Sequence, residues 1–335
     1  MGRSTWKYQL FFLFSLILHS QLPFPSSLSS SLSSMPQCSA LLHFSKSFSL
    51  DKSASVYDPS YPKTASWQED KHCCTWDGVE CDKNRSHVVG LDLTSSWLMG
   101  HFHSNSTLFF LPNLRRLNLA DNDFNGSLIP SEFGNFKSLT YLNLSYSIFS
   151  GQIPFEISQL SSLVSLDLSE NELLIKAPVW KRVIGNLTQL RELILDDTNM
   201  SSIRPNSLMN LSSSLTTLSL RDSDLRGKLE NIILCLPSIQ TLDLTGNSNL
   251  ESSLLMFSRE FLNSIDNLKS LKHLALPYCN FTGSIPAWLG NFTKLTYLDL
   301  SYNSFNGEIL LPLLNFRSFW LTHQTNNFLI IGEYF

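Results

Sequence analysis

Cysteine is the residue whose spacing in this sequence points most directly to chemistry. Cys38, Cys73, Cys74 and Cys81 crowd into the N-terminal quarter of the chain. In an oxidising compartment such a group forms disulfides, and Cys38–Cys73 with Cys74–Cys81 is the simplest of the three pairings that four cysteines allow. A zinc site is the alternative, but the segment lacks a second CxxC pair and suitably spaced histidines. We therefore predict two disulfides, with their pairing left open at this point.

Histidine offers a second candidate for chemistry. His101 and His103 form an HxH pair that could ligate a metal ion. No third ligand is in view, so a solvated loop is the favoured interpretation, and we predict no metal and no cofactor. The sequence also has no Gly-rich phosphate loop, kinase catalytic loop, GxSxG or HExxH motif. The chain is therefore not expected to be an enzyme.

The N-terminal segment indicates the compartment. Arg3 and Lys7 precede the apolar run LFFLFSLIL at 10–18, which is too short to span a bilayer because a spanning helix needs about 20 residues. A basic flank before a short apolar core predicts a secretory signal peptide over 1–25, with the cleavage site left open. An uncleaved anchor is the alternative. A Ser-rich leader without periodicity follows at 26–36.

The composition narrows the class of protein. The 335 residues carry a net charge of −4, and only 16% are charged, against about 25% in ordinary soluble domains. This nearly neutral balance gives no electrostatic case for a nucleic-acid partner or an anionic membrane surface. The chain holds 61 Leu, 53 Ser and 25 Asn. Such a bias suggests a repeat that reuses one buried leucine pattern.

A repeated LxxLxL pattern fills the middle of the chain. Its spacing is mostly 24–27 residues, which is the period of a leucine-rich repeat. The fourth and sixth slots share one face of a short strand, and no unit can bury its own leucines, so the strands must stack in parallel. The first slots of the nine units are Val88, Leu114, Leu139, Leu163, Leu190, Leu215, Ile239, Leu271 and Leu295.

Two later slots complete the unit. An Asn amide in the ninth slot can bond backbone groups where the strand ends. The slot holds Asn122, Asn171, Asn247 and Asn303, with Ser96, Ser147, Thr198, Ser223 or Cys279 in other units. Phenylalanines in the eleventh slot predict an aromatic spine through the interior. They are Phe124, Phe149, Phe281 and Phe305.

The sequence FxGxIP after LxxLxLxxN, found around Ile153-Pro154 with Ser147 in the Asn slot, together with CCTWDGVEC at 73–81, resembles plant extracellular leucine-rich repeat receptor-like proteins and receptor kinases. The resemblance implies an α/β fold: a right-handed solenoid with a curved parallel β-sheet on its concave face and short helical, 3-10 or β segments on its convex side. It implies an N-terminal cap at 37–87, stapled by Cys38–Cys73 and Cys74–Cys81, and repeats at 88–309.

The cap has a physical purpose, because an open solenoid end exposes apolar surface. We expect a short helix around Ala40–Phe48 within it. After Gly307 the pattern stops, and 310–335 is expected to be an atypical tail, as from a truncated or alternatively spliced gene. No transmembrane segment is predicted in this chain.

The resemblance also implies a function. Relatives of this kind bind an extracellular peptide, protein or glycan in defence or development and signal through partner kinases, at the cell membrane when full-length. The alternative is a secreted inhibitor of a cell-wall hydrolase, similar to polygalacturonase-inhibiting proteins. Those carry a cysteine-bearing C-terminal cap, whereas no cysteine follows Cys279 here.

The concave strand face is the expected binding surface, because it is long and rigid, and Tyr and Arg are typical interface anchors. For any one residue, a merely solvated position is the alternative. The candidates in outward slots are Arg115, Arg116, Asn118, Tyr141, Tyr146, Asp167, Glu170, Arg191, Glu192, Asp196, Asp197, Arg221, Asp222, Asp243, His273, Tyr278, Tyr297, Asp299 and Tyr302.

Nine N-x-S/T sequons support an extracellular glycoprotein. Asn143 is set apart from the others, because it lies on the strand's outward face, where a glycan would obstruct binding. The predicted glycosylation sites are Asn84, Asn105, Asn125, Asn186, Asn199, Asn210, Asn280 and Asn291.

Overall fold

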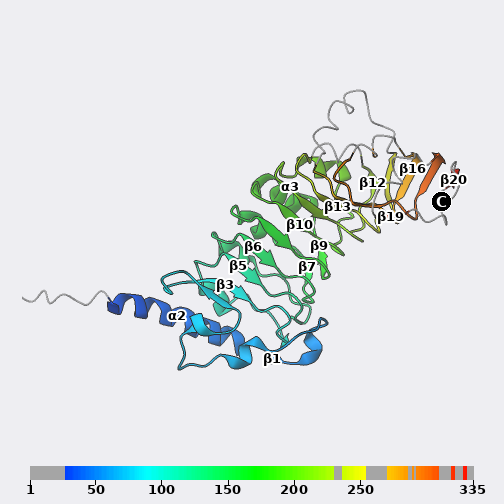
Figure 1. The fold of residues 1–335 in the computed structure, drawn as a ribbon. Helices are drawn as coiled ribbons and strands as arrows, with labels where there is room; N and C mark the ends of the chain where they lie inside the picture. The colour runs from blue at the N-terminus through cyan, green and yellow to red at the C-terminus, as the bar shows by residue number, and fades with distance from the viewer. Residues whose placement is uncertain are drawn as a thin grey trace, which may run out of the picture.

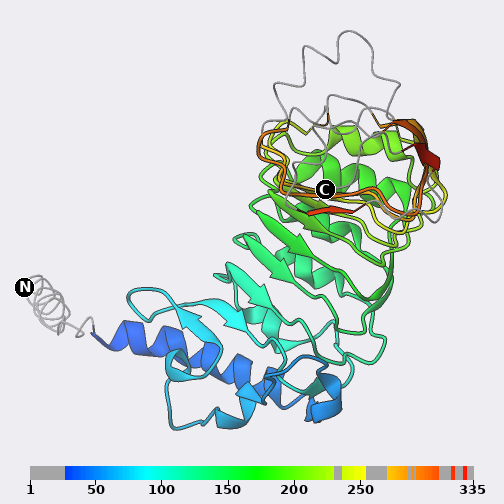
Figure 2. The same cartoon turned by 45° about the vertical axis from the view of Figure 1, so that its right-hand side comes forward.

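The computed structural model describes residues 27–229, 236–253, 270–285, 289, 292–308, 318–320 and 327–329. The predicted signal peptide at 1–25, Cys235 and the sequon residue Asn291 lie outside these ranges. The described part is a curved solenoid with helix α2 at one end (Figures 1 and 2).

The main sheet confirms the predicted stack of repeats. Each of the nine units contributes one strand, and all neighbouring strands are parallel except the first pair, β2 and β3. The fourth-slot leucines face one another across the sheet, as in the register of Leu117 with Leu142. In spatial order, its strands are β2 (Val79–Cys81), β3 (Val88–Asp92), β5 (Arg116–Asn118), β6 (Tyr141–Asn143), β8 (Ser165–Asp167), β10 (Glu192–Ile194), β11 (Thr217–Ser219), β13 (Thr241–Asp243), β15 (His273–Ala275), β17 (Tyr297–Asp299) and β19 (Ser318–Trp320).

The return side of the units is built from a mixture of strands, 3-10 helices and one α-helix (Figure 1). A second parallel sheet holds β12 (Gly227–Lys228), β14 (Leu250–Ser253), β16 (Asn280–Ser284), β18 (Ser304–Glu308) and β20 (Asn327–Leu329), and a smaller one holds β7 (Ser150–Gln152) and β9 (Glu172–Leu174). The predicted solenoid fold class is therefore confirmed. The return helices are η4 (Thr107–Phe110), η5 (Ser131–Asn135), η6 (Phe155–Gln159), α3 (Ala177–Asn186) and η7 (Pro205–Asn210).

The core follows directly from the repeat. Leu142 and Leu144, in the fourth and sixth slots of one unit, are fully buried, and the same slots are buried in the other units. One continuous apolar cluster runs from the cap to Phe305. Because each unit buries its leucines against its neighbours, stability is shared along the stack.

The ninth-slot asparagines bind backbone groups as predicted. The Nδ2 of Asn122 donates to the carbonyls of Leu93 and Leu119 at 2.8 and 2.9 Å, and its Oδ1 accepts from the N–H of Leu98 at 3.0 Å. Ser147 does part of this work through its Oγ, which donates to the Leu119 carbonyl. Thr198 differs, because its buried hydroxyl has no hydrogen-bond partner.

The predicted aromatic spine is interrupted. Phe124 and Phe149 are in contact, with ring centroids 5.0 Å apart, and Phe281 and Phe305 lie 6.4 Å apart. Between these pairs, buried Leu and Met side chains take the eleventh slot, as Met200 does. The slot needs a large apolar side chain, and several residue types meet that need.

Both disulfides have the pairing that the resemblance implied, Cys38–Cys73 and Cys74–Cys81. The first joins α2 (Ser27–Ser45) to η3 (Cys73–Thr75), and the second joins η3 to β2. The cap also contains η1 (Lys52–Ala54), η2 (Lys63–Ser66) and β1 (Ser49–Leu50), which pairs with β4 (Leu98–Met99). Trp67 stacks on Trp76 with ring centroids 5.1 Å apart. The predicted cap is thus confirmed as a disulfide-stapled cover over the first repeat.

The cap helix is longer than expected. Helix α2 begins at Ser27, inside the segment predicted to be a leader without periodic structure, and ends at Ser45 instead of extending to Phe48. Once the turn around Leu41 is anchored in the core, each further residue adds one hydrogen bond without a new nucleation cost. Helix can therefore continue through a serine run that carries no apolar pattern.

The sheets extend into the segment that was expected to be an atypical tail. β19 pairs in parallel with β17, placing Phe319 in register with Leu298, and β20 pairs in parallel with β18. The backbone therefore adds another strand to each sheet beyond residue 309. An LxxLxL search misses such a unit, because an aromatic residue stands at the fourth slot.

The described part of the chain contains no helix that could cross a membrane. None of its helices combines the length and the apolar character that crossing a bilayer requires.

Candidate binding face

The predicted binding residues fall on five slots of the main sheet. The second slot holds Arg115 and Arg191, which are exposed where their strands begin. The third slot holds Arg116, Tyr141, Glu192, His273 and Tyr297; the fifth holds Asn118, Asp167, Asp243 and Asp299; the seventh holds Asp196 and Arg221; and the eighth holds Tyr146, Glu170, Asp197, Asp222, Tyr278 and Tyr302. The structure thus brings them onto one face in rows that run across the strands.

The third-slot row contains two aromatic contacts. The guanidinium of Arg116 lies over the Tyr141 ring, 4.9 Å from its centroid. Four repeats lie between this pair and the second one, in which His273 and Tyr297 stack with centroids 4.1 Å apart and planes 1° apart. Burial lowers the pKa of His273, although the carboxylates of Asp243 and Asp299 act in the opposite direction. Each pair offers a flat aromatic surface in the third-slot row.

The fifth-slot residues first serve their own turns. The Oδ1 of Asp167 accepts from the N–H and the Oγ of Ser169, at 3.0 and 2.6 Å. Asp299 does the same with Ser301, at 3.0 and 2.6 Å. Burial raises the pKa of Asp167, although these hydrogen bonds act in the opposite direction. Because one carboxylate oxygen of Asp167 and of Asp299 is engaged in the turn, only the other oxygen is left for a ligand.

Asp196 is also committed to the backbone. It is buried, and its Oδ1 accepts from the Oγ of Ser219 at 2.6 Å and the N–H of Arg221 at 2.8 Å. Sequence patterning places Asp196 in an outward slot, but its contacts are those of a turn residue. Arg221 itself is exposed.

The eighth slot forms the most distinctive row. Its residues have left-handed φ values, such as 52° at Tyr146, 54° at Glu170 and 58° at Asp197. Their N–H groups donate to carbonyls of the next repeat, as that of Glu170 does to Asp196 at 3.1 Å. We call this row the eighth-slot ladder; its members from the third repeat onward are Tyr146, Glu170, Asp197, Asp222, Gly246, Tyr278 and Tyr302. Left-handed backbone at Tyr and Glu is costly, so it must be held by the surrounding stack.

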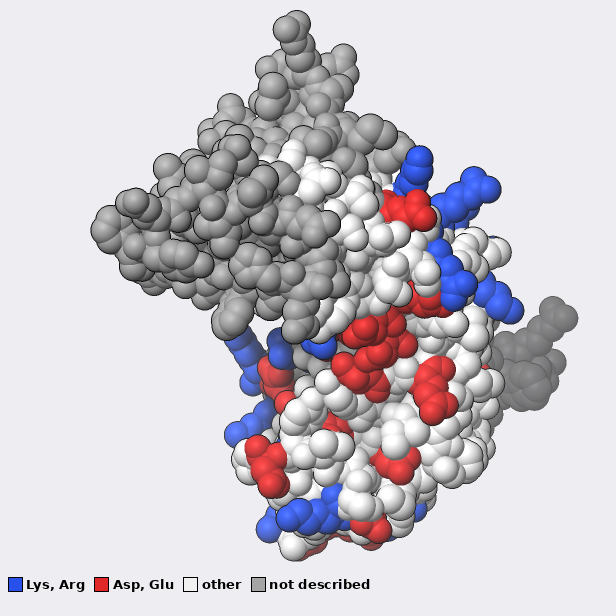
Figure 3. Space-filling view, turned by 90° about the vertical axis from the view of Figure 1, so that its right-hand side faces the viewer, with Lys and Arg blue, Asp and Glu red and all other residues white. Residues whose placement is uncertain are grey.

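The ladder is aromatic at its ends and acidic in the middle. Tyr278 stacks on Tyr302 with centroids 4.0 Å apart. Burial and the neighbouring carboxyl group of Asp197 raise the pKa of Glu170, and burial with the charge of Asp197 raises the pKa of Asp222. On the face shown in Figure 3, acidic side chains gather in the middle and basic ones lie mostly at its margin.

The cap supplies a part of this face that the sequence did not predict. Tyr57 contacts Tyr146, with ring centroids 5.1 Å apart. The carboxylate of Asp121 holds the cap loop in place, because it accepts from the N–H groups of Val56 and Tyr57 at 2.7 and 3.3 Å. No spacing rule connects a cap loop to an eighth slot more than sixty positions away. Asp121 occupies the eighth slot of its repeat, as Tyr146 does in the next one, so the repeat period could have identified it.

The predicted glycosylation sites that the structure describes fall outside these five slots. Asn84, Asn105, Asn125, Asn186, Asn199, Asn210 and Asn280 are exposed, and none occupies one of the five slots. Asn143 is half-buried in β6, and its Oδ1 accepts from the N–H and the Oγ of Ser145 at 2.9 and 2.8 Å. Its side chain is therefore engaged in the fold.

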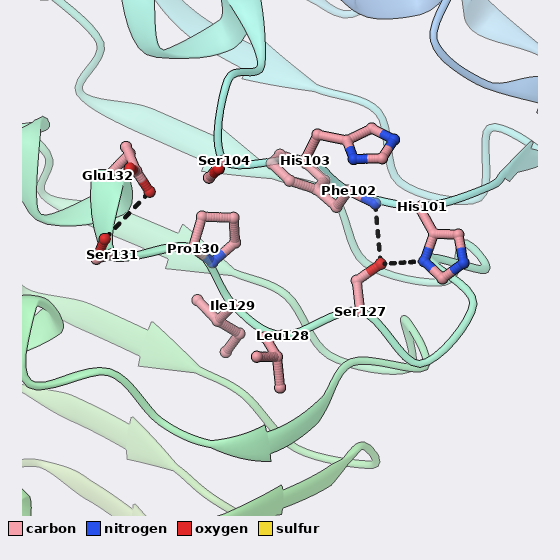
Figure 4. A pocket seen from close by; sticks show the side chains of 10 residues that line it. All are labelled: His101, Phe102, His103, Ser104, Ser127, Leu128, Ile129, Pro130, Ser131 and Glu132. Carbon is pink, nitrogen blue, oxygen red and sulfur yellow. Dashed lines mark hydrogen bonds between the residues drawn. The ribbon is translucent and has the colours of Figure 1, made fainter.

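The histidine pair lines a hollow on another side of the first repeats (Figure 4). This hollow of about 480 Å³ is bounded by His101, Phe102 and His103 on one side and by residues 127–132 on the other. His101 bonds Ser127 and the sequon residue Asn125, at 3.3 and 3.0 Å. Within the described residues, the one trio with converging metal-ligand atoms is Cys38, His72 and Cys73, whose sulfurs are joined in a disulfide.

Sequence comparison shows the family. Residues 90–335 match the family described as Leucine-rich repeat region, and residues 36–82 match the Leucine rich repeat N-terminal domain. The chain belongs to the leucine-rich repeat proteins. Its relatives are plant receptor-like proteins, as the FxGxIP and CCTWDGVEC sequences implied. The matched leucine-rich repeat regions of receptor-like proteins are ligand-binding and not enzymatic, so the expectation that the chain is not an enzyme is confirmed.

Two relatives and one solved structure define the extent of the likeness. Receptor-like protein 6 of Arabidopsis thaliana is 39% identical over 277 residues, covering 78% of this chain and 27% of that protein. Receptor-like protein 9DC1 of Solanum pimpinellifolium is 41% identical over 293 residues, covering 85% and 32%. The chain thus spans about a third or less of these relatives. The Arabidopsis receptor kinase HAESA, solved with the peptide hormone IDA and the co-receptor SERK1, is 29% identical with a TM-score of 0.61, covering 85% of this chain and 50% of that one.

Neutralising the middle of the ladder is expected to stabilise the unliganded leucine-rich repeat chain. Asp197→Asn with Asp222→Asn should raise the free energy of unfolding by about 1 kcal/mol at pH 7, because like charges on neighbouring strands repel. The pKa of Asp222 is raised above its ordinary 3.8, so the folded state holds more protons just above that pH and stability falls as pH rises there.

The gain should therefore disappear below about pH 3, where the carboxyl groups are protonated in both states. Urea denaturation at the two pH values measures it. The matched control is Asp70→Asn with Glu132→Gln, which removes the same charge at an exposed cap position and a half-buried position in η5. A gain of equal size at both pH values would contradict the electrostatic cause.

Cys279 is expected to be unreactive in the folded chain. Its Sγ donates to the Leu244 carbonyl at 3.2 Å, and burial raises the pKa of its thiol to about 12. Because the thiolate is the reactive form, iodoacetamide at pH 8 should modify Cys279 only after unfolding in urea. Peptide mapping by mass spectrometry separates Cys279 from Cys235. Rapid modification of Cys279 in the folded chain would show that the ninth slot opens.

Proposed function

We propose that the chain is an extracellular recognition module that binds a peptide ligand on its concave sheet face. The observation that carries the proposal is the rows of exposed or half-exposed aromatic and charged side chains on this rigid sheet, with no exposed sequon of the described residues in one of the five slots. Glycans at those sequons would leave the side chains of the five slots unmodified. Rigid aromatic and Arg anchors are typical of protein interfaces.

The relatives support the same function. HAESA is described with a peptide hormone and a co-receptor, and the curated relatives are receptor-like proteins. We extend this to a co-receptor kinase as a second partner of the ligand-bound chain. Because the chain spans about a third or less of those relatives, signalling is proposed for the ligand-bound assembly as a whole.

The test uses the glycosylated chain secreted from plant cells and a library of synthetic peptides about 11 residues long, which in extended form span roughly the length of the face. We expect binders whose affinity falls in Arg116→Ala and in His273→Ala. Lys181→Ala, at an exposed position on α3, is the control and should leave binding unchanged.

Two results would overturn the proposal. One is a set of binders that respond to Lys181→Ala but to neither face variant. The other is inhibition of a purified polygalacturonase without any peptide binding, which would favour the hydrolase-inhibitor alternative.

A further inference from the structure

Exposed apolar side chains lie at the N-terminal side of the acidic residues in the eighth-slot ladder. Tyr57 of the cap loop, 49% exposed, contacts Tyr146 of the third repeat, 37% exposed. Val56, 81% exposed, precedes Tyr57 in the chain, and Ile148, 47% exposed, follows Tyr146 by two positions. We call these four residues the cap patch. Exposed apolar side chains gathered from two separate parts of a chain mark interaction sites.

The cap patch is held in place before any ligand arrives. Tyr57 packs edge-on against Tyr146, at 81° between ring planes. Asp121, which is 2% exposed, fixes the Val56 and Tyr57 N–H groups and also accepts from the Oγ of Ser95 at 2.6 Å. A preformed surface loses little conformational entropy on binding.

Three carboxylates continue from the patch along the ladder. Glu170, Asp197 and Asp222 follow Tyr146 on the next three units, and Glu170 interacts with both Tyr146 and Asp197. Within the part of the chain that the structure describes, no Lys or Arg lies within 4.0 Å of these three carboxylates. Arg221 is the nearby cation, and the charges that act on it most strongly are those of Asp196 and Asp243. Arg221 also acts on Glu170 and Asp222, so these ladder acids share this cation with Asp196 and Asp243.

We propose that the cap patch and these acids together bind an extended peptide segment of the pattern Φ-x-B-x-B, in which Φ is apolar and B is Lys or Arg. The proposal rests on the function proposed above and names the ligand class. Φ packs on Tyr57 and Tyr146, and the two basic side chains face Glu170, Asp197 and Asp222. Charge complementarity selects this occupant over a neutral or acidic peptide.

The spacing supports this pattern. Neighbouring parallel strands lie about 4.8 Å apart, so three ladder acids span roughly 10 Å. Alternate side chains of an extended peptide are about 7 Å apart and share one face. Two basic residues at alternate positions therefore reach all three carboxylates while the apolar residue stays over the cap patch.

The experiment measures binding of two matched peptide sets to the secreted chain. One set carries Φ-x-Lys-x-Lys or Φ-x-Arg-x-Arg within peptides of about 11 residues, and the other carries Glu in place of each basic residue. We expect binding of the basic set only, weakening as salt is raised. Asp197→Asn with Asp222→Asn should weaken it about tenfold, and Val56→Asp should weaken it similarly by loss of the apolar contact.

The control is again Asp70→Asn with Glu132→Gln, which changes the net charge equally and should leave the dissociation constant unchanged within about twofold. Circular dichroism and urea denaturation of each variant check folding. If peptides bind the face but show no preference for basic over acidic sets, or if the ladder and control variants behave alike, this inference falls and the proposed function stands. If no peptide of any kind responds to Arg116→Ala or His273→Ala, the proposed function falls with it.

Discussion

Asn171→Ala is expected to lower the free energy of unfolding by about 4 kcal/mol. The Nδ2 of Asn171 donates to the carbonyls of Leu144, Leu168 and Ser169 at 2.9, 3.0 and 2.9 Å. Its Oδ1 accepts from the N–H groups of Ser147 and Phe149 at 3.2 and 2.9 Å. All of these groups are buried, so alanine leaves backbone donors and acceptors unpaired in the core.

A graded series makes this prediction specific to the amide. Asn171→Ser should cost about half as much, because the serine at the same slot, Ser147, still donates to two carbonyls. Asn135→Ala, at an exposed position, is the control and should change stability by less than about 0.5 kcal/mol. Urea denaturation gives the three values. An alanine variant no less stable than the serine variant would mean that the hydrogen bonds of the ninth-slot amide contribute little.

The two disulfides of the cap should differ in their contribution to stability. Cys38–Cys73 closes a loop of 35 residues and Cys74–Cys81 a loop of 7. By loop-closure entropy, removing the first costs about 4 kcal/mol and removing the second about 2 kcal/mol. The first also joins α2 to the core through Cys73, which is buried in the same apolar cluster as Leu41 and Phe44. Its loss should therefore detach the cover from the first repeat.

The comparison uses Cys38→Ala with Cys73→Ala against Cys74→Ala with Cys81→Ala, so that each pair changes the same atoms. Urea denaturation ranks the two pairs, and hydrogen exchange at β3 reports whether the first repeat has lost its cover. Equal destabilisation, or a larger effect from the short loop, would contradict the loop-length argument.

The repeat pattern predicted most of the fold for one physical reason. The fourth and sixth slots of every unit must be buried against the same slots of the next, so one alignment of leucines sets the register of the whole sheet. Leu142 and Leu166 lie in register as that alignment requires. The same logic predicted the role of the ninth-slot asparagines, since a strand that ends inside a stack needs partners for its backbone groups.

The repeat pattern was less informative where a different apolar residue fills a buried slot, or where a segment is held by its attachment to the core. Met200 takes the place of phenylalanine in the interior, and Phe319 stands in register with Leu298. In both cases the requirement is for volume at a buried slot, not for one residue type. The helical serine run of α2 has no pattern at all, because its helix is continued from an anchored turn.

For the binding face, periodicity placed the candidate residues in outward slots, and it did so from the chain alone. It could not tell Asp196, whose carboxylate serves Ser219 and Arg221, from Asp197, whose exposed carboxylate belongs to the ladder. It also could not bring Tyr57 to Tyr146. Period and slot are local properties of the chain and follow from burial repeated at a fixed spacing. Which carboxylates are left for a ligand depends on hydrogen bonds between neighbouring units and on the folding of the cap over the stack, and those contacts exist only once the solenoid has formed.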